Sequence, residues 1–294
     1  MIPLVIVKQL EKYLAGVFGN NSRIEDCRHT GGGSINEVCA FTCNQKKFFV
    51  KWNTAAQYPG MFETEAKGLA LLASSHTFRI PEVLSSGSAD PYAFLLLEFV
   101  SSGSATKPFW EESGRTLAVL HRHTNPRFGL NHDNFIGSLP QANSQCDDWV
   151  DFYIQMRLEP QIRLAHNNAR ADASLSRSFD RLFQRLVRLF PVEPPSLLHG
   201  DLWSGNLMCD NNQKPVLIDP AVYYGHREMD LAMTALFGGF HQDFYDAYNR
   251  AWPLEQGWEE RVGLCNLYPL MVHVNLFGGS YLSQVNQILK RFAG

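Results

Sequence analysis

The chain contains 294 residues, of which 45% are hydrophobic and 19% are charged. This composition is typical of a folded globular protein and argues against a disordered one, and the length allows one large domain or two moderate ones. The formal net charge is −3, and no basic run is longer than a pair of residues, so we expect no nucleic-acid partner. No stretch approaches the ~18 apolar residues of a membrane span, so we expect no membrane partner either.

The cysteines and the first residues bear on the cellular compartment. The six cysteines include no C-x-x-C pair and are too sparse for a disulfide-stabilised fold, which favours reduced thiols and a cytoplasmic location. Residues 1–18 begin with a short apolar run, which Lys8, Glu11 and Lys12 interrupt. This pattern predicts an amphipathic helix and not a signal peptide, which needs a cationic start, a long apolar core and a cleavage site.

A glycine-rich segment lies between two predicted strands, residues 27–30 and 37–42. Its residues are Gly31, Gly32, Gly33 and Ser34. Glycines let the backbone approach a ligand closely, so such a loop can place its N–H groups over phosphates. The run does not match G-x-G-x-x-G, and a simple hairpin turn is the commoner explanation of such a run taken alone.

The next predicted strand, residues 47–52, carries Lys51 near its end, and a helix is predicted to begin near Met61. Glu65 lies just before the apolar part of this helix. A strand lysine paired with a helix glutamate is the arrangement that holds the α- and β-phosphates of ATP in kinase-like folds. Glu63 is the competing partner, and an unpaired surface position is the ordinary alternative for a helix glutamate.

Two more strands are predicted at residues 80–84 and 93–100, with a loop at residues 85–91 between them. The second strand runs into a Ser/Gly segment at residues 101–104, which is the clearest linker signal in the chain. The predicted division is an N-lobe at residues 1–100, a hinge at 101–106 and a C-lobe at 107–294.

Beyond the linker the apolar residues recur with helical spacing. Helices are predicted at residues 110–122, 147–165, 175–190, 227–240, 242–251, 258–276 and 282–292. A polar, aromatic segment at residues 128–143 is long for a simple connector, and loops of this kind often carry binding residues.

The segment 198–220, LHGDLWSGNLMCDNNQKPVLIDP, predicts a hairpin with polar groups at both ends. Asn206 and Asp219 would supply oxygen ligands of the kind that Mg²⁺ takes, and Asp201 could accept a hydroxyl proton. The order His-x-Asp-x₄-Asn, followed later by Asp, is the one by which kinase-like folds transfer phosphoryl groups. A solvated turn would explain His199 and Asp201 taken alone, but not the added Asn206 and Asp219 at these offsets.

These features predict an α+β chain with a two-lobed, protein-kinase-like fold. The small N-lobe would have an antiparallel sheet and a helix, and the larger C-lobe would be mostly helical. In this architecture the backbone of Glu98, Phe99 and Val100 would meet the adenine ring of ATP.

Four segments together resemble the fructosamine kinase family, also called ketosamine-3-kinases, a branch of the aminoglycoside-phosphotransferase-like kinases. They are HGDLWSGN, DPAVYYGHREMDLAM at 219–233, FGLNHDNFIGSLPQ and TGGGSIN. The first alone marks only the wider superfamily, whereas its Trp203 and the second and third segments are more specific. Ser34 is a departure, because many relatives have a cysteine there, and this puts thiol-based redox control through the loop in doubt.

The resemblance implies that the γ-phosphoryl group of ATP is transferred, with Mg²⁺, to the third-carbon hydroxyl of a ketosamine. The phosphorylated adduct then falls apart and frees the amine, which is a deglycation activity. Fructose, ribulose and erythrulose adducts, on free or protein-bound amines, all remain open as acceptors, and so does the oligomeric state.

The resemblance also implies roles for single residues. Asp201 would be the catalytic base, Asn206 and Asp219 would hold Mg²⁺, and Lys51 with Glu65 would fix the phosphate tail. The residues expected to contact the acceptor are Trp203, which could stack on the sugar or simply pack, and Asp133, Asn134 and Gln141. His199 and Asp230 are expected to support the catalytic loop.

Two alternatives use the same motifs. An aminoglycoside or choline kinase would need a carboxylate-rich surface for its cationic acceptor, but residues 261–294 contain no Asp or Glu. A non-catalytic nucleotide-binding protein of the same fold would have no need to keep Lys51, Asp201, Asn206 and Asp219 together.

Overall fold

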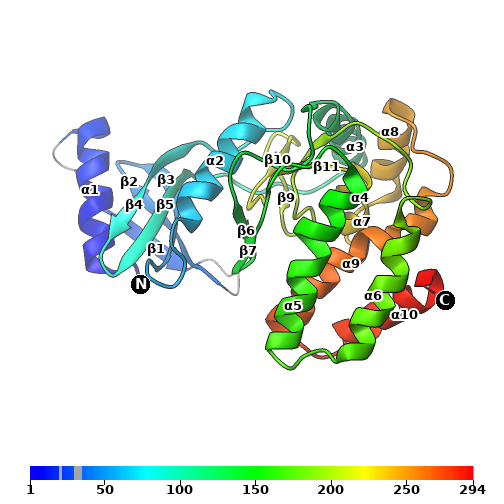
Figure 1. Ribbon diagram of the computed structural model, residues 1–294. Helices are drawn as coiled ribbons and strands as arrows, with labels where there is room; N and C mark the ends of the chain where they lie inside the picture. Colours follow the sequence, from blue (N-terminus) through cyan, green and yellow to red (C-terminus); the bar gives the residue numbers. More distant parts are fainter. Residues whose placement is uncertain (20–21, 30–34, 294) are drawn as a thin grey trace.

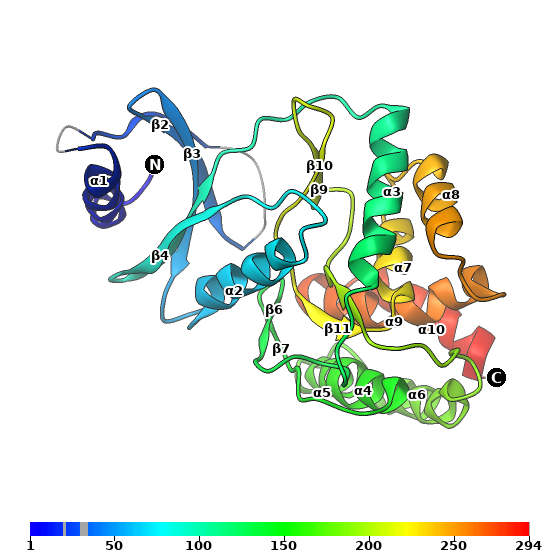
Figure 2. The same ribbon diagram turned by 90° about the horizontal axis from the view of Figure 1, so that it is seen from above.

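A computed structural model describes residues 1–19, 22–29 and 35–293, and it has two lobes (Figures 1 and 2). Within these residues the N-lobe contains an antiparallel sheet of strand order β1-β2-β3-β5-β4. The strands are β1 Glu25–His29, β2 Glu37–Cys43, β3 Lys46–Thr54, β4 Val83–Ala89 and β5 Tyr92–Glu98. The expected two-lobed α+β architecture is confirmed.

One helix covers each face of the sheet (Figure 1). Helix α1, Leu4–Phe18, is amphipathic as predicted and buries Leu10 and Leu14 against one face. Helix α2, Met61–Ser74, buries Phe62 and Leu69 against the other. Because side chains alternate between the two faces along a strand, each strand residue belongs to the α1 side or the α2 side.

The prediction for the fourth strand was wrong. Strand β4 does not end before residue 85 but continues through Ser85–Ser88, which pair with β5 up to Ala93. Only one edge of β4 is paired in the sheet, and most of these side chains are exposed or half-buried, so the strand lacks the apolar alternation that marks a covered one.

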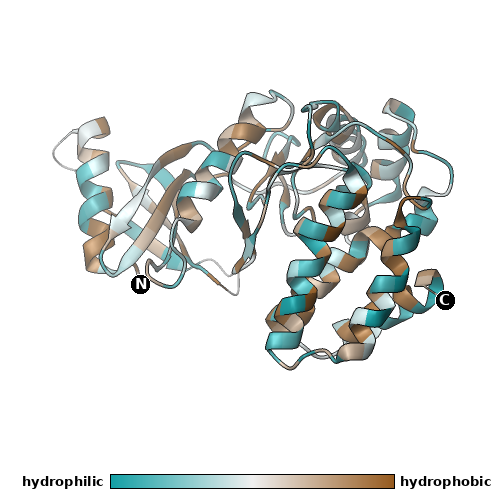
Figure 3. Cartoon of the chain, viewed as in Figure 1, coloured by the Kyte–Doolittle hydropathy of each residue, from teal (hydrophilic) through white to brown (hydrophobic). Residues whose placement is uncertain are grey.

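The C-lobe is built mainly from helices, with three short antiparallel pairs of strands. The helices are α3 Lys107–His121, α4 Trp149–Phe152, α5 Glu159–Asn167, α6 Ala173–Leu186, α7 Glu228–Leu236, α8 Gln242–Ala251, α9 Trp258–Phe277 and α10 Tyr281–Ala293. The pairs are the hairpins β6 Asn134–Ile136 with β7 Leu139–Gln141 and β9 Leu207–Cys209 with β10 Pro215–Leu217, and the non-consecutive strands β8 Ser196–Leu198 with β11 Tyr223–Gly225. Hydrophobic and hydrophilic bands alternate along α5 and α6 (Figure 3), as expected for helices that pack on one side. No helix in the described parts of the chain is long and apolar enough to cross a membrane.

The helix predicted at residues 147–165 is present but is not α-helical throughout. A π-helical segment, Tyr153–Leu158, separates α4 from α5. Here the fully buried Arg157 donates hydrogen bonds to the carbonyl of Ala142, at 2.6 Å, and to the side chain of Asn143, at 2.7 Å. The segment thus ties the helical layer to the polar loop at residues 128–143.

The two lobes are joined by Arg79. Its guanidinium group donates to Asp210 in the turn of the β9–β10 hairpin, at 2.6 Å, and also pairs with Glu98 at the end of β5. The linker beyond β5 runs beside the same turn, where the backbone N–H of Gly103 donates to the carbonyl of Cys209 at 2.7 Å. A Cβ atom at Gly103 would collide with the carbonyl of Asp210, so this close approach requires glycine.

Buried ion pairs fix the segment around α7. Arg227 is 1% exposed, and its Nη2 donates to Glu193 at 2.7 Å and to the carbonyl of Pro253 at 2.8 Å. Arg261 Nη2 lies 2.6 Å from Glu228 Oε1, and Glu228 is also buried. The GHRE part of the sequence therefore holds helices together.

We predict that Arg227→Ala lowers the free energy of unfolding by about 3–5 kcal/mol, because it leaves Glu193 buried without its partner. Chemical denaturation monitored by circular dichroism measures this. The matched control is Arg127→Ala, which removes an exposed pair with Asp147 and should cost less than about 1 kcal/mol. Equal losses for the two variants would contradict the prediction.

Candidate active site

The catalytic loop after β8 is held by one buried carboxylate. Asp230, on α7, accepts hydrogen bonds from the backbone N–H groups of His199 and Gly200 at 2.8 and 2.9 Å. His121 Nε2 lies 3.3 Å from the same carboxylate. Burial alone would raise the pKa of Asp230, but the bond from His121 and the nearby charges bring it below its ordinary value. Asp230 thus stays ionised and braces the backbone of the loop.

His199 connects the two ends of the hairpin. Its Nε2 donates to the carbonyl of Ile218 at 2.9 Å, next to Asp219, and its side chain is fully buried. Burial lowers the pKa of His199, so the ring is neutral near pH 7. A neutral, hydrogen-bonded ring in this place positions the loop and does not exchange protons with a substrate.

Asp201 and Asn206 lie together at the start of the hairpin. Asn206 Nδ2 donates to the backbone carbonyl of Asp201 at 2.8 Å and lies 3.3 Å from its carboxylate. The backbone N–H of Ile218 donates to the carbonyl of Asn206 at 3.1 Å, which brings the neighbouring Asp219 to the same edge. Burial, and next the charge of Asp219, raise the pKa of Asp201 to about 7, as expected for two carboxylates that face one cleft.

Lys51 reaches this edge from the other lobe. Val50 and Trp52 face α1, so Lys51 between them faces α2, where its Nζ lies 2.7 Å from Glu65 Oε1. The same ammonium group contacts Asp219. Burial alone would lower the pKa of Lys51, but Asp219 and then Glu65 raise it above its ordinary value, so the lysine is charged.

The partner on α2 is Glu65 and not Glu63. Glu63 is exposed and pairs with Lys67 one turn along the helix, at 2.7 Å. The side chain of Glu65 is 12% exposed, and its burial raises its pKa, an effect that the charge of Lys51 opposes. Because Lys51 lies on the sheet face that α2 covers, the glutamate on the inner side of α2 reaches it and the exposed one does not.

Comparison with known proteins agrees with this geometry. The model of the family "Fructosamine kinase" matches residues 6–293. The chain belongs to this family. It is therefore an ATP-dependent phosphotransferase, and the sequence-based family prediction is confirmed.

The relatives match over nearly full length. A probable ketoamine kinase of Enterococcus faecium is 40% identical over 89% of this chain and 93% of its own. The chloroplastic protein-ribulosamine 3-kinase of Arabidopsis thaliana is 38% identical, over 92% of this chain and 83% of its own. A crystal structure of a fructosamine-3-kinase homologue from Thermobifida fusca superposes with a TM-score of 0.87 at 32% identity and covers 99% of both chains.

The parts of the kinase expected to bind nucleotide are only partly described. The phosphate-loop residues Gly31–Ser34 lie outside the described residues. At the hinge, the Glu98 side chain is engaged with Arg79, and Val100 is buried. Phe99 is half-buried, and Lys47 Nζ lies 5.5 Å from the centre of its ring.

The polar residues of the β6–β7 hairpin differ from the expectation that they line a sugar pocket. Asn134 Nδ2 donates to the carbonyl of Val222 at 2.8 Å, and Gln141 Nε2 donates to Asn134 Oδ1 at 2.7 Å. Tyr268 donates to Gln141 Oε1 at 2.7 Å, and both amides are buried. These side chains brace the hairpin against the strand that follows Asp219. Asp133 is exposed, but one of its carboxylate oxygens accepts the N–H of residue 143.

Trp203 lies on the surface of the catalytic loop. Its side chain remains 39% exposed, and its six-membered ring covers the position that a Cβ atom of Gly205 would take. The ring thus packs against the loop and stays partly open to solvent. This arrangement is compatible with stacking on an acceptor.

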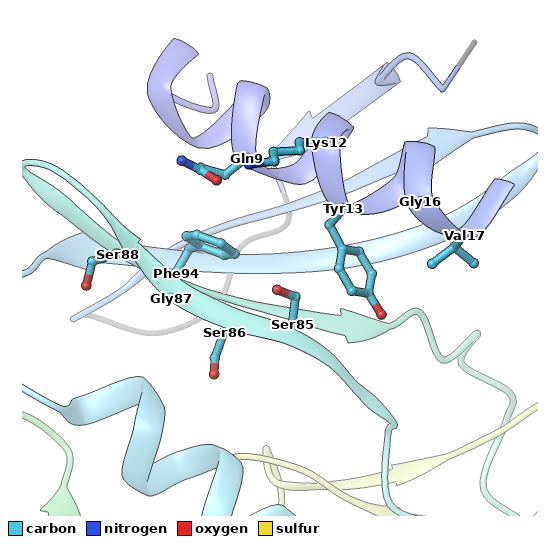
Figure 4. A pocket seen from close by; sticks show the side chains of 10 residues that line it. All are labelled: Gln9, Lys12, Tyr13, Gly16, Val17, Ser85, Ser86, Gly87, Ser88 and Phe94. Carbon is cyan, nitrogen blue, oxygen red and sulfur yellow. The ribbon is translucent and has the colours of Figure 1, made fainter. Parts of the chain in front are cut away.

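A cavity of about 540 Å³ lies elsewhere, between α1 and β4 (Figure 4). Tyr13, Ser85 and Phe94 line it. Phe94 packs in the cluster on the α1 side of the sheet, whereas Lys51 faces α2. The cavity is therefore separated from the catalytic edge by the sheet itself.

Several supporting residues were missed at the sequence level. Arg79 and Asp210 are separated by 131 positions, and no periodicity relates them. Tyr268 lies in a helix whose residues are buried on nearly every side, so nothing distinguished it from other core aromatics. His121 was recognisable only as an inward-facing residue of its helix.

We predict that Gly200→Ala is strongly destabilising. Gly200 has φ +85°, and an added Cβ would collide with the carbonyl of Ala221, so the cost should exceed the ~1–2 kcal/mol of a left-handed residue by about 1–3 kcal/mol. The control is Gly60→Ala, at φ +75° with nothing within 4 Å, which should show only the smaller loss. Thermal and urea unfolding measure both, and equal losses would contradict the crowding argument.

Proposed function

We propose that this kinase transfers the γ-phosphoryl group of ATP to the third-carbon hydroxyl of a ketosamine and thereby promotes release of the amine. The observation that carries the proposal is the contact of Lys51, from the N-lobe, with Glu65 and Asp219 beside the Asp201–Asn206 pair. The relatives named as ketoamine and ribulosamine 3-kinases support the choice of acceptor.

The charges at this edge fit the demands of phosphoryl transfer. The transition state is loose and spreads negative charge over the phosphate oxygens, so positioning and cations supply most of the acceleration. Lys51 provides a fixed cation, and Glu65 holds it in place. Burial and then the charge of Asp219 raise the pKa of Asp201 to about 7, so this carboxyl group can accept the hydroxyl proton near neutral pH.

The donor set also fits Mg²⁺. No group of three or more His, Cys, Asp or Glu side chains in the described residues is arranged to enclose a metal. Mg²⁺ needs no such cage, because it takes one or two protein oxygens and completes its shell with phosphates and water. The amide nitrogen of Asn206 is engaged with Asp201, so its amide oxygen and the Asp219 carboxylate would hold the ion. Bound there, Mg²⁺ would neutralise charge on the β- and γ-phosphates.

The acceptor class is tested directly. We expect purified enzyme with ATP and Mg²⁺ to phosphorylate ribulose or fructose adducts of lysine, and to leave kanamycin unmodified. Coupled ADP release and mass spectrometry of the product measure this. Phosphorylated kanamycin with unreacted ketosamines would favour the aminoglycoside alternative, and a lack of turnover with every acceptor would favour the non-catalytic one.

We predict that Asp201→Asn lowers kcat by roughly 10²- to 10⁴-fold, because an amide cannot accept the hydroxyl proton. The affinity for a non-hydrolysable ATP analogue should change little, since Lys51 and Asp219 are intact. Steady-state kinetics and calorimetric titration separate the two effects. Glu63→Gln, which alters an exposed glutamate of α2, is the control and should keep wild-type kcat. A wild-type kcat in the Asp201→Asn variant would show that Asp201 is not the catalytic base.

A further inference from the structure

The exposed aromatic side chains of this kinase are concentrated in one lobe. Among the Phe, Trp and Tyr residues of the described chain, those classed as exposed are Trp203, Phe237 and Phe277, at 39%, 42% and 55% exposure. All three belong to the C-lobe. Isolated exposed apolar residues need no explanation, but connected ones often mark a binding surface.

The rings of Phe237 and Phe277 are connected through the ring of His273. The centres of the Phe237 and His273 rings are 5.0 Å apart, and His273 lies 5.5 Å from Phe277 and 5.0 Å from Tyr281. We call Phe237, His273, Phe277 and Tyr281 the aromatic patch. Phe237 follows α7, His273 and Phe277 end α9, and Tyr281 begins α10, so three helix ends form one surface.

The aromatic patch continues from the catalytic loop. A Cβ atom at Gly239, two residues beyond Phe237, would lie 2.6 Å from the Cβ of Ser204. Ser204 follows Trp203 directly, so the segment after α7 packs against the loop residue next to the third exposed ring. The segment after α7 thus joins the aromatic patch to the loop that carries Asp201.

The aromatic patch also adjoins the place where the lobes meet. A Cβ atom at Gly137, in the turn of the β6–β7 hairpin, would lie 3.1 Å from Leu276 and 3.4 Å from Ile35. Leu276 precedes Phe277, and Ile35 follows the predicted phosphate loop in the N-lobe. The end of α9 therefore lies beside the β6–β7 turn, which Ile35 of the N-lobe also approaches.

The charges near the aromatic patch indicate what it can bind. Residues 261–294 contain no Asp or Glu. Arg170 is close by, since its Nη1 donates to the carbonyl of Val274 at 2.6 Å. Burial lowers the pKa of His273, so that ring is neutral near pH 7. A polycation would find no counter-charge in residues 261–294, whereas an apolar or aromatic group would find ring faces.

We propose that the aromatic patch binds the substituent on the amine of the ketosamine and selects small-molecule adducts of aromatic amines over those of small or polycationic amines. This inference rests on the proposed function, because it assigns the outer part of the same acceptor site. The sugar would lie at Asp201 and Trp203, and the amine substituent would extend over Phe237 and Phe277. Burial and aromatic pairing together supply the selectivity.

The test compares three acceptors: the ribulose adducts of methylamine, phenethylamine and spermidine. We expect kcat/KM for the phenethylamine adduct to exceed that for the methylamine adduct by at least about tenfold, since one aromatic contact with its burial gives roughly that factor. The spermidine adduct should be no better than the methylamine adduct. The difference should reside mainly in KM, because the patch is remote from the transferred group.

Phe237→Ala and Phe277→Ala are each expected to reduce the phenethylamine-to-methylamine ratio of kcat/KM towards one. A merely structural role would not change this ratio. Val119→Ala and Val187→Ala, which remove exposed apolar side chains outside the patch, are the controls and should keep the wild-type ratio. Melting temperatures report whether each variant is folded.

Different failures are distinguishable. If wild-type enzyme phosphorylates the methylamine adduct without preferring the phenethylamine adduct, the patch assignment is overturned and the proposed function stands. If no ketosamine reacts, both are overturned. If the variants keep the wild-type ratio but change from dimer to monomer in light-scattering measurements, the patch is instead an interface with a second copy of this chain.

Discussion

The ion pair between Lys51 and Asp219 joins the two lobes at the point where chemistry is expected, and the rest of the structure keeps its partners in place. Glu65 holds the lysine from α2, and the hairpin brings the aspartate from the C-lobe. A buried charge of this kind is stable only when it is paired, and Lys51 has one carboxylate partner in its own lobe, Glu65, and one in the other lobe, Asp219. The cleft therefore depends on the relative position of the lobes, which the Arg79 contacts help to fix.

The catalytic loop is held rigid by a buried residue of helix α7. The buried carboxylate of Asp230 accepts hydrogen bonds from two backbone N–H groups and lies beside one histidine. Buried polar networks in which every group has a hydrogen-bond partner make a structure more rigid. The loop can thus present Asp201 and Asn206 in one arrangement without help from the substrate. Catalysis by positioning requires this, because small displacements of reacting groups lower rates steeply.

Much of the family-specific sequence serves support and not contact with a substrate. His226, Arg227 and Glu228 are buried. Arg227 and Glu228 pair with residues from other segments. Asn134 and Gln141, in the other specific segment, brace the same region through hydrogen bonds. A motif of buried polar residues is demanding because each member needs its partner, and this explains how residues such as Arg227 and Glu228 can identify a family through support, whereas Asp219 of the same segment lies at the candidate active site.

Local patterns in the sequence determined the two-lobed α+β class and most helices, because hydrophobic periodicity acts over short distances along the chain. Motif spacing, which is also local, identified the candidate groups Lys51, Glu65, Asp201, Asn206 and Asp219. They misplaced β4, whose polar residues are strand only because β5 pairs with them, and they did not reveal the π-helical segment before α5. Only the tertiary structure decided which polar side chains are already engaged in hydrogen bonds within the protein. Hydrogen bonds between residues distant in the chain engage Asn134 and Gln141, and no local pattern encodes such partners.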